Sequence, residues 1–159
     1  MPGSGKSTVG RLLAAELSLV FFDLDAEIIS SQGKSIAEIF SEGGEELFRK
    51  IESETLINTI NKETPFVMAA GGGTPCFLDG MQKMNDAGTT IYLDTPIDLL
   101  LSRTKKKQHR PLLGENHAEK LKELLKTRKD CYSKANYELQ TKNLELAGKI
   151  EGILKILAD

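Results

Sequence analysis

Short runs of apolar residues, separated by segments with helical spacing, constrain the fold of this chain more than any other sequence feature. The clearest runs cover residues 19–22, 66–70 and 90–93, and residues 136–140 form a weaker further candidate. Apolar runs that do not alternate with polar residues are typical of strands buried on both faces. Because helical segments separate these runs, we predict an α/β domain with a parallel sheet covered by helices.

Helical spacing of apolar residues indicates the segments that cover this sheet. The predicted helices lie over residues 7–17, 36–40, 45–61 and 96–101, around Arg128, and in a C-terminal segment that ends near Leu157. The 159-residue chain contains no internal repeat, low-complexity tract or linker. We therefore expect a single domain over residues 1–159.

The composition of the chain excludes several classes of binding partner. The net charge of -2 disfavours a general polyanion-binding protein, and no apolar run approaches the length of a membrane span. The two cysteines, Cys76 and Cys131, are too few and too far apart for a disulfide framework, which fits a reducing compartment. The first residues lack the basic and apolar regions of a secretion signal. We expect a cytoplasmic protein that binds neither nucleic acid nor a membrane.

The sequence opens with the second half of a phosphate-binding loop, Gly3-Ser4-Gly5-Lys6-Ser7-Thr8. Glycines allow backbone N–H groups to turn toward an anion at the start of a helix. In such a loop Lys6 reaches the β- and γ-phosphates of a nucleotide, and Ser7 holds Mg²⁺. The first glycine of the full pattern, and the strand that feeds the loop, would fall before Met1. A glycine-rich tail is therefore the competing interpretation.

Two pairs of charged residues have both a functional and a structural explanation. Asp23 and Asp25 stand where the first predicted strand ends, at the edge where ligands bind in open parallel sheets. Taken alone, Asp25 is better explained as the cap of the helix that follows. Arg49 and Glu52 have the spacing of an ordinary surface salt bridge on a helix, which is again the simpler explanation.

Three consecutive glycines, Gly71, Gly72 and Gly73, directly follow the second predicted strand. A turn needs only one glycine, whereas three remove every side chain where the ligand crevice of the sheet should lie. We therefore predict that a small molecule approaches the backbone at this glycine run.

Basic residues gather between Arg103 and Lys134, where eleven Lys and Arg face four Asp and Glu. Most such segments are solvated helix faces and loops. Arg110 is an exception, because Pro111 stiffens the loop around it and allows it to meet a phosphoryl group when the loop closes. Arg128, on the helix that follows, is a second candidate for binding an anionic substrate.

Together these motifs resemble the shikimate kinase family, small phosphate-loop kinases of the nucleoside-monophosphate-kinase type. The segments that carry the resemblance are 2–8, 22–25, 35–40, Phe48-Arg49 with Glu52, 71–73 and 110–113. It implies a three-layer α/β/α fold with a central parallel sheet in the order 2-3-1-4-5, whose first strand is missing from this sequence. It also implies a lid at about residues 104–117 and a shikimate-binding region at about residues 24–61.

The resemblance further implies a role for each motif. Shikimate would be bound by Asp25, Arg49, Gly71, Gly72, Gly73 and Arg128, with the two arginines on its carboxylate and Asp25 on a hydroxyl. ATP would be bound by Gly3, Ser4, Gly5, Lys6, Ser7, Thr8, Arg103 and Arg110, and Mg²⁺ by Ser7 and Asp23. The catalytic residues would be Lys6, Asp25 and Arg110. Since phosphoryl transfer has a loose transition state, Asp25 is first an orienting group and only second a general base.

The implied activity is phosphorylation of the 3-hydroxyl of shikimate by ATP, in aromatic amino-acid biosynthesis, by a monomer. Two alternatives stay open, a related small-molecule kinase such as gluconate kinase and a catalytically impaired nucleotide-binding relative. A gluconate kinase would not need Arg49, Arg128 and the glycine run together. The missing strand favours the impaired relative, whereas retention of Lys6 and Asp25 argues against decay. We expect the active enzyme to contain roughly ten further residues, including the central strand, before Met1.

Overall fold

The computed structural model describes residues 1–105 and 116–158 of the chain. Its elements are α1 (Lys6–Glu16), β1 (Val20–Asp23), α2 (Leu24–Gln32), α3 (Ile36–Ile60), β2 (Phe66–Ala69), the 3₁₀ helix η1 (Thr74–Cys76), α4 (Gly80–Ala87), β3 (Ile91–Asp94), α5 (Ile97–Lys105), α6 (His117–Tyr132), β4 (Tyr137–Gln140) and α7 (Leu146–Ala158). All the predicted strands are confirmed, and their ends differ from the predicted ends by at most one residue.

The helix that follows β1 begins two residues earlier than the sequence suggested. Asp23 is its N-cap, and the Asp23 Oδ1 accepts a hydrogen bond from the Asp25 backbone N–H at 3.2 Å. The interpretation of Asp25 as the cap is therefore wrong, and Asp25 lies in the first turn of α2.

Element α3 consists of the two helices predicted over residues 36–40 and 45–61, which meet at a kink at Gly43 and Gly44. A capping box between Ser35 and Glu38 fixes its start, with hydrogen bonds in both directions. Gly44 has a φ of 65°, which glycine adopts without strain and which breaks the helix. Within residues 1–105 and 116–158, neither α3 nor any other helix is long and apolar enough to cross a membrane.

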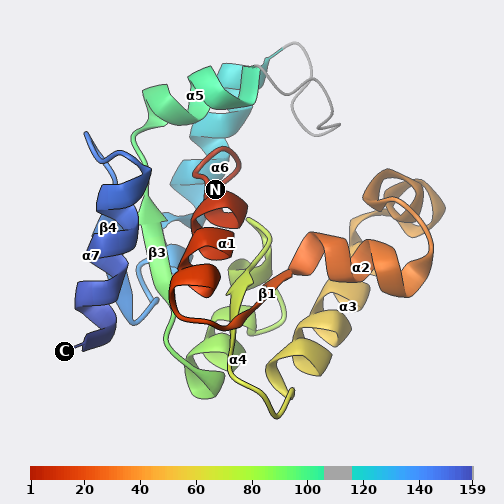
Figure 1. Ribbon diagram of the computed structural model, residues 1–159. Coiled ribbons are helices and arrows are strands. Elements are labelled where there is room, and N and C mark those ends of the chain that lie inside the picture. The colour runs from red at the N-terminus through yellow and green to blue at the C-terminus, as the bar shows by residue number, and fades with distance from the viewer. Residues whose placement is uncertain (106–115, 159) are drawn as a thin grey trace.

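The described strands form two separate parallel pairs rather than one continuous sheet. β1 pairs with β2 from Val20 opposite Phe66, and β3 pairs with β4 from Ile91 opposite Tyr137. Figure 1 shows the two pairs on either side of α1, with α7 beside β3 and β4 and with α2 and α3 extending to the opposite side. These neighbours agree with the two ends of the order 2-3-1-4-5, and the centre of that order stays a prediction.

A cavity of about 620 Å³ lies between the two strand pairs. Strands β2 and β3 both line it, together with α1 and α7, and its apolar wall includes Met1, Val9, Val67, Ile91, Leu93 and Ile153. Within residues 1–105 and 116–158, the buried apolar residues form three clusters, centred on α2–α3, on α5–α6 and on α1–α7. We refer to this cavity below as the central cavity.

Candidate active site

The backbone of the N-terminal loop requires glycine at two positions. Gly3 has a φ of 78° and Gly5 a φ of 89°, and a Cβ atom on Gly3 would stand 2.9 Å from Thr104 Cγ2. Gly5 is the N-cap of α1, so the loop delivers backbone N–H groups to the helix start, where anions bind favourably. Lys6, the first residue of α1, donates from Nζ to the Met1 carbonyl at 2.9 Å.

The remaining loop residues divide into a buried anchor and an exposed face. Ser4 is 1% exposed and donates its hydroxyl to the Met1 carbonyl. Ser7 and Thr8 are exposed in the first turn of α1. The predicted loop is therefore formed as a turn around the start of α1, with its small polar side chains on the outside.

Ser7 and Asp23 are brought together from α1 and the end of β1. The Ser7 hydroxyl donates to Asp23 Oδ2 at 2.5 Å. Hydroxyl and carboxylate oxygens are ligands that Mg²⁺ prefers, and kinases hold this ion with one or two protein groups in addition to nucleotide phosphates. The pair therefore fits the predicted magnesium site in both chemistry and position.

Arg49 on α3 has a fixed and largely buried side chain. Its Nη1 donates to Glu52 Oε2 at 2.7 Å, and its Nη2 donates to Glu45 Oε1 at 2.9 Å. The guanidinium also stands over the Phe77 ring, 4.0 Å from its centroid. The Arg49 side chain is only 11% exposed and that of Glu52 only 4%, so the expectation of an ordinary surface salt bridge is wrong.

The glycine run is packed against these charged groups. A Cβ atom on Gly71 would stand 2.9 Å from Glu52 Oε1 and 3.3 Å from Asp25 Oδ1, and one on Gly73 would collide with the Arg49 guanidinium. A Cβ atom on Gly72 would stand 3.4 Å from Arg128 Nη1 on α6. A Cβ atom at the first or third of these positions would force the neighbouring side chains to shift. The run brings Asp25, Arg49 and Arg128 to one place.

Glu52 was noted from the sequence only as a partner of Arg49, and two further residues at this place, Thr74 and Tyr132, were not singled out. Glu52 accepts a hydrogen bond from Thr74 Oγ1 at 2.6 Å, and Tyr132 donates its hydroxyl to the Gly72 carbonyl at 2.5 Å. The spacing of Arg49 and Glu52 was a signal for their contact but not for their burial. Thr74 and Tyr132 had no signal beyond their nearness in sequence to Gly73 and Arg128.

A second group of cations borders the N-terminal loop. Arg103 on α5 donates from Nη1 to the Gly3 carbonyl at 3.3 Å, which places it at the predicted nucleotide site. Burial lowers the pKa of the nearby Lys149 on α7, and the Arg103 charge adds to this effect. Lys149 was not foreseen, because a single lysine in a C-terminal helix carries no pattern. The two cations give this side of the loop a positive charge that suits an anion.

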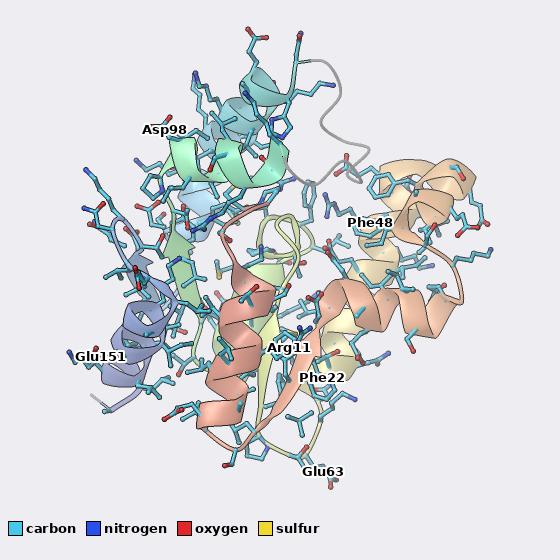
Figure 2. All side chains as sticks on the ribbon, turned by 45° about the horizontal axis from the view of Figure 1, so that its top comes forward. Arg11, Phe22, Phe48, Glu63, Asp98 and Glu151 are labelled. Carbon is cyan, nitrogen blue, oxygen red and sulfur yellow. The ribbon has the colours of Figure 1, made fainter. Side chains whose placement is uncertain are left out.

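The predicted site residues come from both sides of α1. In Figure 2, Phe48, the neighbour of Arg49, lies on the side of α2 and α3, whereas Asp98 near the start of α5 lies on the other side of α1. Arg110 and most of the predicted lid at 104–117 lie outside the described residues.

Comparisons with known proteins agree with this geometry. The family model described as Shikimate kinase matches residues 2–158. A shikimate kinase of Persephonella marina is 42% identical over 139 residues, which cover 87% of this chain and 84% of that protein. A structure of the Acinetobacter baumannii shikimate kinase in complex with shikimate has a TM-score of 0.92 and 37% identity, covering 99% of this chain and 89% of that one.

A crystal structure of the Bacteroides thetaiotaomicron shikimate kinase gives a similar result. Its TM-score is 0.90 at 32% identity, and the match covers 99% of this chain and 94% of that one. Both the sequence and the fold therefore agree over nearly the whole chain. This chain belongs to the shikimate kinase family.

Proposed function

We propose that this protein is an ATP-dependent kinase that phosphorylates the 3-hydroxyl of shikimate, in the biosynthesis of aromatic amino acids. The observation that carries the proposal is the meeting of Asp25, Arg49 and Arg128 at the glycine run, in a chain of the shikimate kinase family. The relative from Acinetobacter baumannii forms a complex with shikimate. A gluconate kinase or an impaired relative has no comparable observation in its favour.

Arg49 and Arg128 would hold the carboxylate of shikimate. Arginine presents a planar fork that matches a carboxylate better than lysine does. In the absence of ligand, Arg49 forms an ion pair with Glu45, whose side chain is 58% exposed. Exposed ion pairs are weak, so the shikimate carboxylate would replace Glu45 at little cost. Glu52 is buried and would stay in place, which keeps the orientation of the guanidinium.

The N-terminal loop and its neighbours would hold the nucleotide. Backbone N–H groups from Gly3 to Thr8 and the Lys6 ammonium would bind the phosphates, and Arg103 would stack on the adenine. Ser7 and Asp23 would hold Mg²⁺, which neutralises charge on the phosphates. Arg110 stays a prediction as a residue that approaches the transferred group from the lid.

The transfer forms a bond between the shikimate 3-oxygen and the γ-phosphorus and breaks the bond from that phosphorus to the bridging oxygen, so that ADP leaves. Asp25 would orient the hydroxyl and receive its proton. Lys6 would stabilise the charge that develops on the transferred group.

We further propose that residues 1–159 belong to one kinase domain whose sheet has the order β1-β2-X-β3-β4, where X is a strand from outside these residues. Both β2 and β3 line the central cavity, and each has one partner strand among the described residues. A parallel strand inserted there would join the two pairs into one sheet with helices on both faces.

ADP release measured with shikimate, with gluconate and without an acceptor tests the function. We expect release to depend on shikimate and to stay at the background level with gluconate. Equal release with and without shikimate, in a folded protein, would contradict the proposal and favour the impaired relative.

Replacement of Arg49 by lysine is expected to weaken shikimate binding by roughly tenfold to a hundredfold, because lysine keeps the charge but loses the bidentate fork. The dissociation constant for ATP should stay near that of the wild type. Both constants are measured by calorimetry. Arg11→Lys is the matched control, since Arg11 stands over the Phe21 ring, 5.5 Å from its centroid, and outside the site. Equal weakening of both ligands would indicate damage to the fold instead.

A further inference from the structure

Tyr132 connects α6 to the glycine run through one buried hydroxyl. The residue is 3% exposed, and its hydroxyl donates to the Gly72 carbonyl at 2.5 Å, across 60 positions of sequence. Its ring stacks on Tyr92 of β3, with centroids 5.0 Å apart and an interplanar angle of 25°. The ring is thus held by packing while the hydroxyl binds the loop.

The hydroxyl keeps its proton under ordinary conditions. Burial raises the pKa of Tyr132 to about 12, although the charge of nearby Arg128 opposes the rise. A phenol with a pKa above its ordinary value of about 10 stays neutral throughout the physiological range and remains a donor. The hydrogen bond from Tyr132 to the Gly72 carbonyl is therefore not lost by deprotonation near neutral pH.

The direction of the Gly72 carbonyl determines the direction of the next backbone N–H in the glycine run. The peptide bond that joins Gly72 to Gly73 is planar and trans, so the carbonyl and the Gly73 N–H point in opposite directions. Glycine has unusual backbone freedom, and three in succession leave the direction of this peptide plane weakly determined by the chain itself. A hydrogen bond to the carbonyl thereby also sets where the Gly73 N–H points.

Arg128 shares this arrangement because it lies one helical turn before Tyr132 on α6. Residues four apart on a helix share a face. Arg128 Nη1 stands 3.4 Å from the position of a Cβ atom on Gly72, and the Tyr132 hydroxyl stands 3.8 Å from the same point. Tyr132 therefore binds the run directly from the same face of α6 that presents Arg128.

We propose that Tyr132 is a positioning residue for the acceptor site, whose hydroxyl aligns the glycine run and Arg128 with the bound substrate. The proposal rests on shikimate being the acceptor. It assigns to Tyr132 no contact with the substrate and no part in the bond-making step. Removal of the Tyr132 hydroxyl should therefore weaken acceptor binding far more than nucleotide binding.

Tyr132→Phe removes the hydroxyl and keeps the stacked ring. We expect the KM for shikimate to rise by about fivefold to tenfold, the effect of losing one such hydrogen bond. The KM for ATP and kcat should stay within about twofold of the wild type, because the contact of the hydroxyl with the N-terminal segment is a weak one, 3.5 Å from Met1 Sδ. The ratio of the two shikimate KM values should not vary between pH 6 and 9, since Tyr132 does not titrate there.

Tyr92→Phe is the matched control. It removes the hydroxyl of the other ring in the same stack, which lies 3.3 Å from Asp94 Oδ1 rather than near the run. We expect wild-type KM values for both substrates. A Tyr132→Phe protein with an unchanged shikimate KM, or with shikimate and ATP affected equally, would overturn the proposal.

Amide hydrogen exchange provides a readout that needs no substrate. Exchange of the Gly73 amide should accelerate in Tyr132→Phe and stay unchanged in Tyr92→Phe, whereas equal rates in all proteins would overturn the positioning role. A wild-type protein that shows no shikimate-dependent ADP release would instead contradict the function on which the proposal rests. The two failures are thereby distinguished.

Discussion

A strand supplied to the central cavity is expected to raise the melting temperature of this protein by at least about 10 °C, given that ~1 kcal/mol corresponds to about 2–4 °C in a domain of this size. The strand would be carried on an N-terminal extension of roughly ten residues. It would bury about four apolar side chains, each contributing roughly 1.5–3 kcal/mol before the entropic cost of ordering the strand. Kinase activity should rise together with the melting temperature, because the phosphate loop would gain a rigid strand behind it. Circular dichroism and ADP release measure the two effects.

A proline-containing form of the same extension is the control. Proline in the middle of the added strand removes a ladder hydrogen bond and is not accommodated between two neighbouring strands. If the native-like and the proline-containing extensions stabilise the protein equally, the added residues do not pair with β2 and β3. Protection of β2 and β3 amides from exchange in the first form alone would place the strand between them.

Replacement of Lys6 by alanine is expected to lower kcat by roughly a hundredfold to a thousandfold, with a much smaller change in the KM for shikimate. Lys6 begins α1 beside the N-terminal glycine turn. In the proposed mechanism, its charge would oppose the charge that develops on the transferred phosphoryl group. The loss should therefore fall on the transition state more than on the bound acceptor. Steady-state kinetics, in whichever of the two chain lengths is the more active, measure the effect.

Lys155→Ala is the control for this variant. Lys155 has an exposed side chain on α7 and pairs with Glu151 at 2.8 Å, so its loss should leave turnover unchanged. A Lys6→Ala protein with a wild-type melting temperature and a turnover within about threefold of the wild type would remove Lys6 from the mechanism.

Local patterns predicted the elements of this fold well because each pattern depends on a few neighbouring residues. The strands were foreseen within one residue, and α1 begins at Lys6, one residue before the predicted start, whereas α4 was not predicted. The two predicted helices of α3 are present on either side of the kink at Gly43 and Gly44, although two glycines mark a break without determining the direction of the chain beyond it. The central cavity was not foreseeable from periodicity, because a strand pair carries no signal for what lies on its other edge.

For the charged residues of the site too, local sequence patterns do not determine contacts between distant segments. The resemblance to the family implied that Asp25, Arg49 and Arg128 share one site, and the structure brings their side chains near the glycine run. The burial of Glu52 was missed, because the spacing to Arg49 defines a shared helix face but not what covers that face. The Tyr132 contact depends on two segments 60 positions apart, and no local pattern encodes such a distance.

The close packing of the glycine run also limits how this enzyme can escape an inhibitor. Resistance commonly arises when a larger side chain narrows a pocket, yet a Cβ atom at Gly71 or Gly73 would displace Glu52 or the Arg49 guanidinium. Every substitution that excludes a competing ligand there would also disturb the groups that hold the natural substrate. A compound that lies directly on this backbone should therefore face few viable resistance mutations, and those that arise should be found in the surrounding side chains.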